Sequence, residues 1–365
     1  NPEWLEKAII YEIYPQTFYD ANGDGIGDLP GVIAKLDYVQ SLGANTIWLN
    51  PCFESPFGDA GYDISDFYKV APRYGTNEDL RRLFAEARRR GIRVLLDLVA
   101  GHTSVDCEWF KQSQKHERNA YSDWYIWSPS LFNFNPDGSR HQFISGMSER
   151  AGGYLPNFFP FQPALNYGFA NPDPDIPWQQ PVDAPGPKAV RAELKKIIKF
   201  WLDMGASGFR CDMASSLVKD DPGSRGTMQV WQEIRAWMDQ EYPDAALISE
   251  WGRPEYAIQA GFHIDFYLSF GVVGLTSLFR RQYGLMGFGG NGFSFFDAQG
   301  LGNIMDFVSE YVPRFNATRK AGYICMFSGN HDTTPRLGFQ RTAQDLKLDF
   351  AFLLSMPGVP KVYYG

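Results

Sequence analysis

Three carboxylic acids in this sequence follow short apolar segments and could act together. Asp212 and Glu250 end their segments directly, and Asp332 comes five residues after its segment. Each segment is typical of a buried strand, and the carboxyl ends of parallel barrel strands meet at one mouth. Carboxylates that converge repel one another unless their surroundings separate their pKa values. One ionised and one protonated carboxyl group is the pair that glycosidic bond cleavage requires.

Three basic side chains accompany these acids. Arg210 stands two residues before Asp212 on the same predicted strand, so the two side chains share a face. His102 follows another apolar segment, and His331 directly precedes Asp332. Each taken alone has an ordinary explanation, such as a salt bridge or a hydrogen-bonded loop histidine. A buried Arg/Asp pair is costly unless both charges are used, so the joint pattern favours an active site.

Strand-like and helix-like segments alternate along the chain, which predicts a parallel sheet. Eight such units predict an α/β fold of the (β/α)8 barrel type. The predicted helices span 30–42, 77–90, 188–204, 226–242 and 303–320. The predicted strands span 8–15, 46–50, 93–99, 207–211, 246–250, 263–270, 323–327 and 361–365.

The alternation is interrupted once, after the third predicted strand. Residues 102–166 are rich in aromatic residues, Pro and Gly, without a long helix or a parallel strand. We therefore expect an inserted subdomain there, with residues 1–101 and 167–365 forming the barrel. The sequence stops at the eighth strand, so we expect a fragment without the last helix or any C-terminal β domain.

Composition limits the kinds of partner. The net charge of −8 argues against nucleic acid or an anionic membrane, and no stretch of 18 apolar residues occurs. The 16% aromatic content fits either a rich core or a cleft that stacks sugar rings. Four cysteines lack metal-ligand spacing and are expected to be buried free thiols. The sequence determines neither the oligomeric state nor the location of the protein. A cytoplasmic location and a secreted or periplasmic one after removal of a signal both agree with it.

The segment after the first strand carries oxygen-bearing side chains at alternate positions, separated by glycines. Such a loop can wrap a hard cation, and a solvated acidic turn is the alternative. It is no EF-hand, because Gly31 occupies the twelfth position. We expect structural Ca²⁺, with Mg²⁺ as the alternative, and no organic cofactor. The expected metal-site residues are Asp20, Asn22, Asp24, Ile26 and Asp28.

These motifs resemble those of a known family. The strings DLVAGHTS (97–104), GFRCDMA (208–214), LISEW (247–251) and FSGNHD (327–332) resemble the four signature regions of the α-amylase family of glycoside hydrolases. FQPALN (161–166) resembles its fifth region. DANGDGIGDL (20–29) resembles the calcium loop of the oligo-1,6-glucosidase-like branch.

The resemblance implies roles for individual residues. Asp212 would be the nucleophile, Glu250 the general acid/base and Asp332 the stabiliser of the transition state. Arg210 would keep Asp212 ionised, His102 and His331 would bind sugar hydroxyls, Tyr62 would stack on the sugar, and Asp63 with Arg336 would close the pocket as in exo-acting members.

Several positions depart from the family pattern. Gly101, Ala164 and Ser216 replace residues of the amylase-type calcium site beside the insert, so we predict that this second site is absent. Arg336 stands one residue farther from Asp332 than in the oligo-1,6-glucosidase pattern, which weakens the exo assignment.

The resulting hypothesis is a retaining α-glycoside hydrolase that trims α-glucosidic oligosaccharides by double displacement. The alternatives are a transglycosylase, isomerase or phosphorylase of the same family, similar to trehalose synthase or sucrose isomerase, or an endo-acting amylase. A non-catalytic relative is disfavoured, because all three carboxylate positions are filled. The sequence does not fix the linkage preference.

Overall fold

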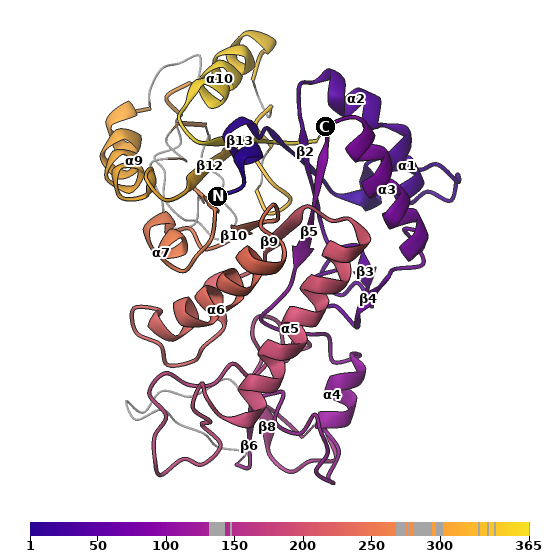
Figure 1. The fold of residues 1–365 in the computed structure, drawn as a ribbon, viewed down its shortest axis with the longest axis vertical. Coiled ribbons are helices and arrows are strands. Elements are labelled where there is room, and N and C mark those ends of the chain that lie inside the picture. The colour runs from indigo at the N-terminus through magenta and orange to yellow at the C-terminus, as the bar shows by residue number, and fades with distance from the viewer. Residues whose placement is uncertain are drawn as a thin grey trace.

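The computed structural model describes residues 1–130, 143–146, 148–267, 275, 278–279, 294–296, 302–327, 329–333, 336–338 and 341–364. Eight parallel strands close into a barrel in the order β1-β13-β12-β11-β10-β9-β5-β2, which confirms the predicted fold (Figure 1). The barrel strands are β1 (Ile10–Ile13), β2 (Thr46–Leu49), β5 (Arg93–Leu98), β9 (Gly208–Cys211), β10 (Ala246–Ser249), β11 (Ile264–Phe266), β12 (Tyr323–Phe327) and β13 (Val359–Tyr363).

All eight predicted strands exist, most of them shorter than predicted. Residues 268–270 and 365, which the prediction included, lie outside the described residues, as does most of the Gly/Phe-rich segment 284–302. The helices are α1 (Leu29–Ala34), α2 (Leu36–Ser41), α3 (Asn77–Arg89), α4 (Glu108–Ser113), α5 (Pro185–Met204), α6 (Arg225–Glu241), α7 (Pro254–Gln259), α9 (Ile304–Thr318) and α10 (Ala343–Ser355), with 3-10 turns at Glu3–Lys7, Pro15–Thr17 and Ala214–Ser216.

The helices differ from the prediction in two respects. The helix expected over 30–42 is broken at Lys35, which leaves the helical region between α1 and α2. Helices α7 and α10 had not been predicted. Helix α3 follows its sequence signals closely: Thr76 and Asp79 form a reciprocal capping box, and the predicted apolar stripe is buried.

Strand register sets up the mouth of the barrel. Asp97 on β5 lies opposite Arg210 on β9, and Arg210 lies opposite Ile248 on β10. Side chains opposite each other on neighbouring strands point the same way, so Asp97 and Arg210 share one face. A small antiparallel hairpin, β3 (Phe53–Glu54) with β4 (Asp66–Val70), stands in the loop after β2 and was not predicted.

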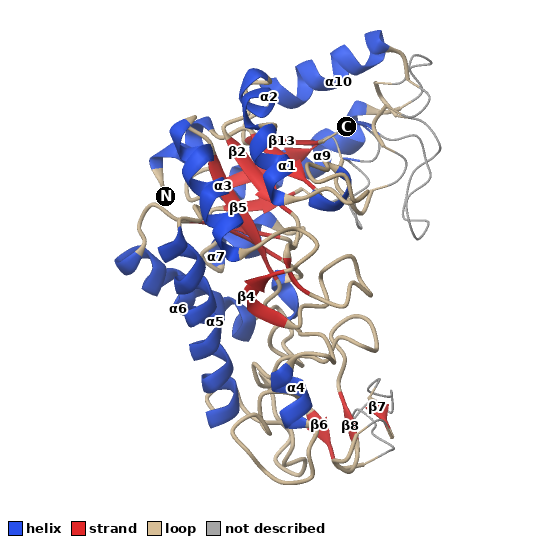
Figure 2. Cartoon of the chain, turned by 90° about the vertical axis from the view of Figure 1, so that its right-hand side faces the viewer, coloured by secondary structure: helices blue, strands red, loops and turns tan. Residues whose placement is uncertain are grey.

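The insert lies at one end of the molecule, away from most of the barrel strands (Figure 2). It contains α4 and an antiparallel sheet of β6 (Trp127–Ser128), β8 (Gly153–Tyr154) and β7 (Ile144–Ser145). Phe110 stacks on Trp127 and meets Tyr154 edge to face, so aromatic rings build a small core here. The exact domain boundaries stay a prediction.

The four cysteines are buried and free, as expected. Burial raises the pKa of the Cys107 thiol to about 11 and that of Cys52 to about 12, so both are protonated at neutral pH. Among the described residues, no helix is both long enough and apolar enough to span a membrane.

Candidate active site

One guanidinium joins the two foremost candidate carboxylates. Nη1 of Arg210 donates to Oδ1 of Asp212 at 2.9 Å, and Nη2 lies 2.8 Å from Oε2 of Glu250. The two carboxylates follow β9 and β10 at the same end of the barrel. A shared guanidinium favours a short separation, and retaining glycosidases need about 5 Å between the two carboxyl groups.

Asp97 supports this guanidinium from below and was not assigned a role from the sequence. Its Oδ1 accepts from Nη1 of Arg210 at 2.9 Å, and its Oδ2 accepts from Trp48 Nε1 and Tyr62 Oη. Asp97 and Arg210 are each 1% exposed. The signal in the sequence was a charged residue inside an otherwise apolar strand, which is costly to bury without a partner.

The carboxylates above this pair reach the surface of the mouth. The side chains of Asp212, Glu250 and Asp332 are 10%, 13% and 39% exposed. A backbone turn with positive φ at Met213 directs its N–H to Oε2 of Glu250 at 2.9 Å. The structure therefore brings the three predicted carboxylates to one mouth, as the strand topology implied.

The cluster holds more negative charge than Arg210 can neutralise. Burial, and then the neighbouring Glu250, raise the pKa of Asp212 well above its ordinary value, although Arg210 opposes the rise. Burial also raises the pKa of Asp332, and Glu250 adds to that shift. Burial and the neighbouring carboxylate therefore oppose the ionisation of Asp212, whereas Arg210 favours it, and the expected role of Arg210 stays a prediction.

Tyr62 and His331 form one wall of the mouth. Their rings stack at 5.3 Å between centroids, and Tyr62 Oη lies 2.9 Å from His331 Nε2. The same ring nitrogen lies 3.3 Å from Oδ2 of Asp332. Both predicted residues therefore lie beside the third carboxylate, where a sugar could contact them.

His102 is buried and both of its ring nitrogens have protein partners. Nδ1 accepts from Asn157 Nδ2 at 3.2 Å, so Nε2 carries the hydrogen and donates to Tyr62 O at 3.2 Å. Both ring nitrogens therefore have protein partners here, and the expected binding of a sugar hydroxyl by His102 stays a prediction. His102 instead ties the insert, through Asn157, to the loop that carries Tyr62.

A half-buried lysine was missed by sequence reasoning. Nζ of Lys219 donates to Asn157 Oδ1 at 2.9 Å and to Ser216 O at 2.6 Å. Asn157 Nδ2 also reaches Ser216 Oγ at 3.2 Å and lies close to Gly101. An ammonium therefore occupies the junction where the sequence departs from the amylase calcium pattern.

We expect the burial of His102 to appear in the pH dependence of stability. Burial lowers its pKa to about 4, so between pH 6.5 and 4 only the unfolded chain binds this proton. The free energy of unfolding should be unaffected by His102 above pH 6.5 and fall by about 3 kcal/mol on acidification to pH 4. Denaturant titrations at several pH values give the free energy of unfolding as a function of pH. Between pH 6.5 and 4 this free energy should fall more steeply with acidification in the wild type than in His102→Gln.

His263 provides the matched control for this prediction. It is also buried, and its pKa is lowered to about 3 at a site remote from Asn157. His263→Gln should remove a comparable pH dependence while leaving the His102 contribution in place. The same pH dependence of the free energy of unfolding in wild type and His102→Gln would contradict the expectation.

Asp63 and Arg336 do not meet. Asp63 is fully buried and accepts three hydrogen bonds, from Ser55 Oγ and from the backbone of Gly58 and Asp59. Its carboxylate therefore stabilises the loop after β3 through these three hydrogen bonds.

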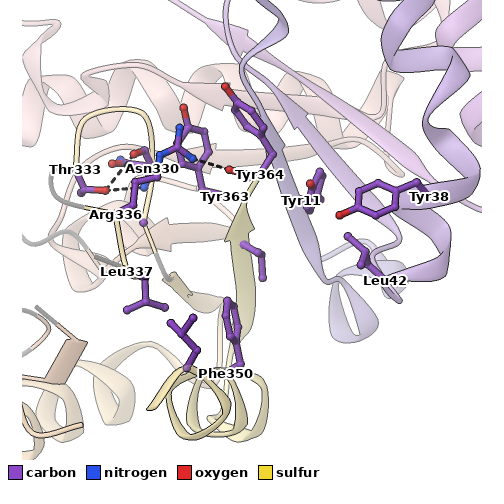
Figure 3. A pocket seen from close by; sticks show the side chains of 14 residues that line it. Tyr11, Tyr38, Leu42, Asn330, Thr333, Arg336, Leu337, Phe350, Tyr363 and Tyr364 are labelled. Carbon is purple, nitrogen blue, oxygen red and sulfur yellow. Dashed lines mark hydrogen bonds between the residues drawn. The ribbon is translucent and has the colours of Figure 1, made fainter. Parts of the chain in front are cut away.

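Arg336 lies beside the end of β13. Its Nη1 donates to Tyr364 O at 2.6 Å and its guanidinium lies over the ring of Tyr363. It lines a groove of about 260 Å³ with Leu337, Phe350 and Leu42 (Figure 3). The expected role of Arg336 and Asp63 in closing the pocket stays a prediction.

Asp59 is the loop acid that faces the mouth, and it was not predicted. Burial raises its pKa, and the charges of Asp63 and Asp332 raise it further, while His331 lowers it. Its Oδ2 accepts from Gln162 Nε2 of the insert at 2.7 Å. Asp59 thus places a fourth carboxylate near Asp332 and His331.

The side-chain oxygens of the Asp20–Asp28 segment stabilise the loop through its own backbone. Asp20 accepts from the N–H groups of Gly23 and Gly25, at 2.7 and 2.8 Å, and Asp28 caps α1 through Gly31. Within the described ranges, no three His, Cys, Asp or Glu side chains gather as a metal site. These side chains still offer the oxygen ligands that Ca²⁺ prefers. A carboxylate oxygen that accepts a hydrogen bond from the loop has a further lone pair with which it can bind a cation.

A closed (β/α)8 barrel with an acidic mouth around one arginine defines a carbohydrate-processing type of enzyme scaffold. The sequence matches the family described as "Alpha amylase, catalytic domain" over residues 12–365, and the chain belongs to that family.

Individual relatives show the range of proteins to which the chain is similar. It is 41% identical over 221 residues, 60% of the chain, to oligo-1,6-glucosidase of Heyndrickxia coagulans, covering 37% of that protein. It is 38% identical over 261 residues, 68% of the chain, to trehalose synthase/amylase TreS of Mycolicibacterium smegmatis, covering 41% of it. Each match therefore spans less than half of the curated relative.

A solved structure of the α-glucosyl transfer enzyme XgtA is similar over the whole chain. The TM-score is 0.75 at 29% sequence identity, with 100% of this chain and 68% of the other covered.

Proposed function

We propose that this chain is the catalytic barrel of a retaining α-glycoside hydrolase acting on α-glucosidic oligosaccharides. The observation that carries the proposal is the bridging of Asp212 and Glu250 by Arg210, with Asp332 at the same mouth. Relatives named for oligo-1,6-glucosidase activity support the choice of substrate.

In this proposal Asp212 attacks the anomeric carbon while Glu250 protonates the leaving oxygen, which breaks the glycosidic bond. Glu250 then takes a proton from water, which cleaves the covalent intermediate and returns Asp212 as a carboxylate. This division of roles requires a protonated acid and an ionised nucleophile, and Arg210 beside Asp212 favours the ionised nucleophile. Asp332 and Tyr62 would contact the distorted sugar.

The side of the mouth near Asp59 favours recognition of a chain end. Asp59, His331 and Asp332 crowd one wall, where carboxylates can accept hydrogen bonds from terminal sugar hydroxyls. Asp59 thereby replaces Asp63 as the acidic residue of an exo-type pocket.

Transfer of the glucosyl unit to another sugar is the second candidate. It is favoured by the similarity to proteins named trehalose synthase and α-glucosyl transfer enzyme. Both reactions share the covalent intermediate and differ only in the acceptor.

Product analysis tests both candidates together. Purified protein would be given maltose and isomaltose, and early products followed by proton NMR. Retaining hydrolysis predicts that the glucose from the non-reducing end first appears as the α-anomer, in excess of the anomeric mixture that the reducing-end unit of the substrate already carries, whereas transfer predicts new disaccharides with little free glucose. An early excess of β-glucose over that mixture, or no reaction on any α-glucoside of the panel, would exclude the proposal.

We propose Ca²⁺ as the cation of the Asp20–Asp28 loop, with Mg²⁺ as the alternative. Asp20, Asn22, Asp24, Asp28 and the backbone at Ile26 would hold it, and it would supply structural stability rather than chemistry.

Removing the cation should therefore lower thermal stability. A ligand present at 100 times its Kd stabilises by about 2.7 kcal/mol, so chelation should lower Tm by several degrees. Asp24→Ala should lower Tm in calcium and abolish the effect of chelator, whereas Asp175→Asn, an exposed acid elsewhere, should retain it. A Tm insensitive to EGTA and to added calcium would contradict this proposal.

A further inference from the structure

A buried ion pair lies beneath the candidate mouth and has no part in the chemistry described so far. Glu12 on β1 and Lys361 on β13 are 0% and 1% exposed, and the ammonium directly contacts Glu12 Oε2. Lys361 Nζ also donates to Gly329 O at 2.8 Å. A buried carboxylate with an ammonium partner remains ionised, and removing one member leaves the other charge uncompensated.

The second oxygen of Glu12 faces His331. Oε1 lies 2.8 Å from Nδ1 of His331. An ionised carboxylate can only accept hydrogen bonds, so Nδ1 must carry a hydrogen. The side-chain amide of Asn50 also lies 3.0 Å from Nδ1, and the amide orientation that turns Oδ1 toward the ring agrees with this hydrogen and gives the otherwise unpartnered Oδ1 a donor. Glu12 thereby fixes one side of the imidazole ring from β1.

The opposite ring nitrogen can be assigned in the same way. Tyr62 gives its single hydroxyl hydrogen to Asp97 Oδ2 at 2.9 Å. Toward Nε2 of His331, also at 2.9 Å, the hydroxyl must therefore accept. Nε2 also carries a hydrogen, and a ring with hydrogens on both nitrogens is an imidazolium cation.

The charges around His331 agree with this assignment. Burial lowers the pKa of His331, but the hydrogen bond that His331 donates to Glu12 and the charge of Asp332 outweigh it, so the net shift is upward. Burial alone would raise the pKa of Glu12, but Lys361 and His331 bring it below its ordinary value. Charged groups face His331 from every side: Glu12, Asp332, Asp97 and Asp59 favour the cation, and Arg210 and Lys361 oppose it.

We propose that Glu12, held in place by Lys361, is a positioning residue that keeps His331 as an imidazolium turned toward Asp332 and the mouth. The cation favours the ionised form of Asp332 against the burial that disfavours it, and it orients that carboxylate, which is the form a positively charged sugar transition state requires. The functional half of this inference rests on the proposed function, and the protonation half does not.

Nitrogen-15 NMR tests the protonation directly, because the sequence contains only five histidines. In protein labelled at histidine, His331 should show two protonated ring nitrogens at pH 7, with His331→Gln giving the assignment. Glu12→Gln should lower the titration midpoint of His331 by at least about one pH unit. Because that variant leaves Lys361 buried without its partner, Glu12→Gln/Lys361→Met is the companion that preserves folding.

The matched control is Glu233→Gln. Glu233 pairs with Arg191 and Lys195 between α5 and α6, far from the mouth, so losing its charge should leave the His331 midpoint unchanged. A neutral His331 in wild type at pH 7, or a midpoint that both Glu12 variants leave in place, would overturn the proposal.

The pH profile of kcat/KM tests the functional half. Its alkaline limb should move to lower pH in Glu12→Gln/Lys361→Met by the shift measured by NMR, with KM changing less than kcat. If kcat/KM instead falls by the same factor at every pH, Glu12 is only a structural residue and the positioning role is refuted. Wild-type protein with a cationic His331 but no glycosidase activity would refute the proposed function and leave the protonation assignment intact.

Discussion

Replacing Asp212 with Asn is expected to lower kcat by at least about 10⁴-fold on every α-glucoside, because no covalent intermediate can form. The amide oxygen can still accept from Arg210, so the fold should persist. The loss should be the same for disaccharides and for aryl glucosides with good leaving groups.

Glu250→Gln offers a contrast within the same site. A good leaving group departs without protonation, so this variant should lose far more activity on maltose than on an aryl glucoside. Steady-state kinetics on the two substrates separate the roles of the two carboxylates. Equal losses for both substrates in Glu250→Gln, or residual activity within about tenfold in Asp212→Asn, would contradict the assignments.

Arg210→Met is expected to be the most destabilising single substitution in the mouth. It would leave Asp97, Asp212 and Glu250 without their common cation, and breaking a buried ion pair typically costs about 3–5 kcal/mol. Chemical denaturation should show this loss as a lower midpoint at pH 7. At lower pH the loss should shrink, because protonation neutralises the stranded carboxylates.

Two further variants separate the causes of this loss. Arg210→Met in an Asp97→Asn background should recover part of the stability, since Asp97 is the most deeply buried partner. Arg191→Met removes a buried arginine whose acidic partners are exposed, so it should cost less. A loss below 1 kcal/mol in Arg210→Met would show that the guanidinium does not hold the cluster together.

The barrel could be predicted because each strand is a local apolar segment bounded by turn residues. The β/α rhythm then fixes which strand ends share the mouth, so Asp212, Glu250 and Asp332 could be grouped although more than a hundred residues separate the first from the last. The hairpin β3–β4 was missed because its first strand has only two residues.

Loop geometry explains the placement of Asp63. Asp59 and Asp63 stand in one loop, and positive φ angles at Ala60 and Gly61 reverse the chain between them. These angles turn Asp63 inward onto the backbone of its own loop and leave Asp59 near the mouth. Gly61 indicates a turn in the sequence, but a glycine does not tell which of the two acids the turn directs inward.

The partners of Asp97, Lys219 and Glu12 could not be foreseen for a different reason. Each pairs with residues distant in the sequence, and only the closed barrel and the docked insert bring these groups together. A lone charge in an apolar strand signals that a partner exists without identifying it.

The shielded sulfhydryls of Cys52, Cys107, Cys211 and Cys325 make the native chain inert toward alkylating reagents. A thiol can then be alkylated only when the structure around it opens locally, so the alkylation rate reports how often the segment around each cysteine opens. Cys107 beside α4 monitors the insert, whereas Cys211 on β9 and Cys325 on β12 monitor two separate strands of the barrel. Pulse alkylation read by mass spectrometry could therefore time the fluctuations of each region.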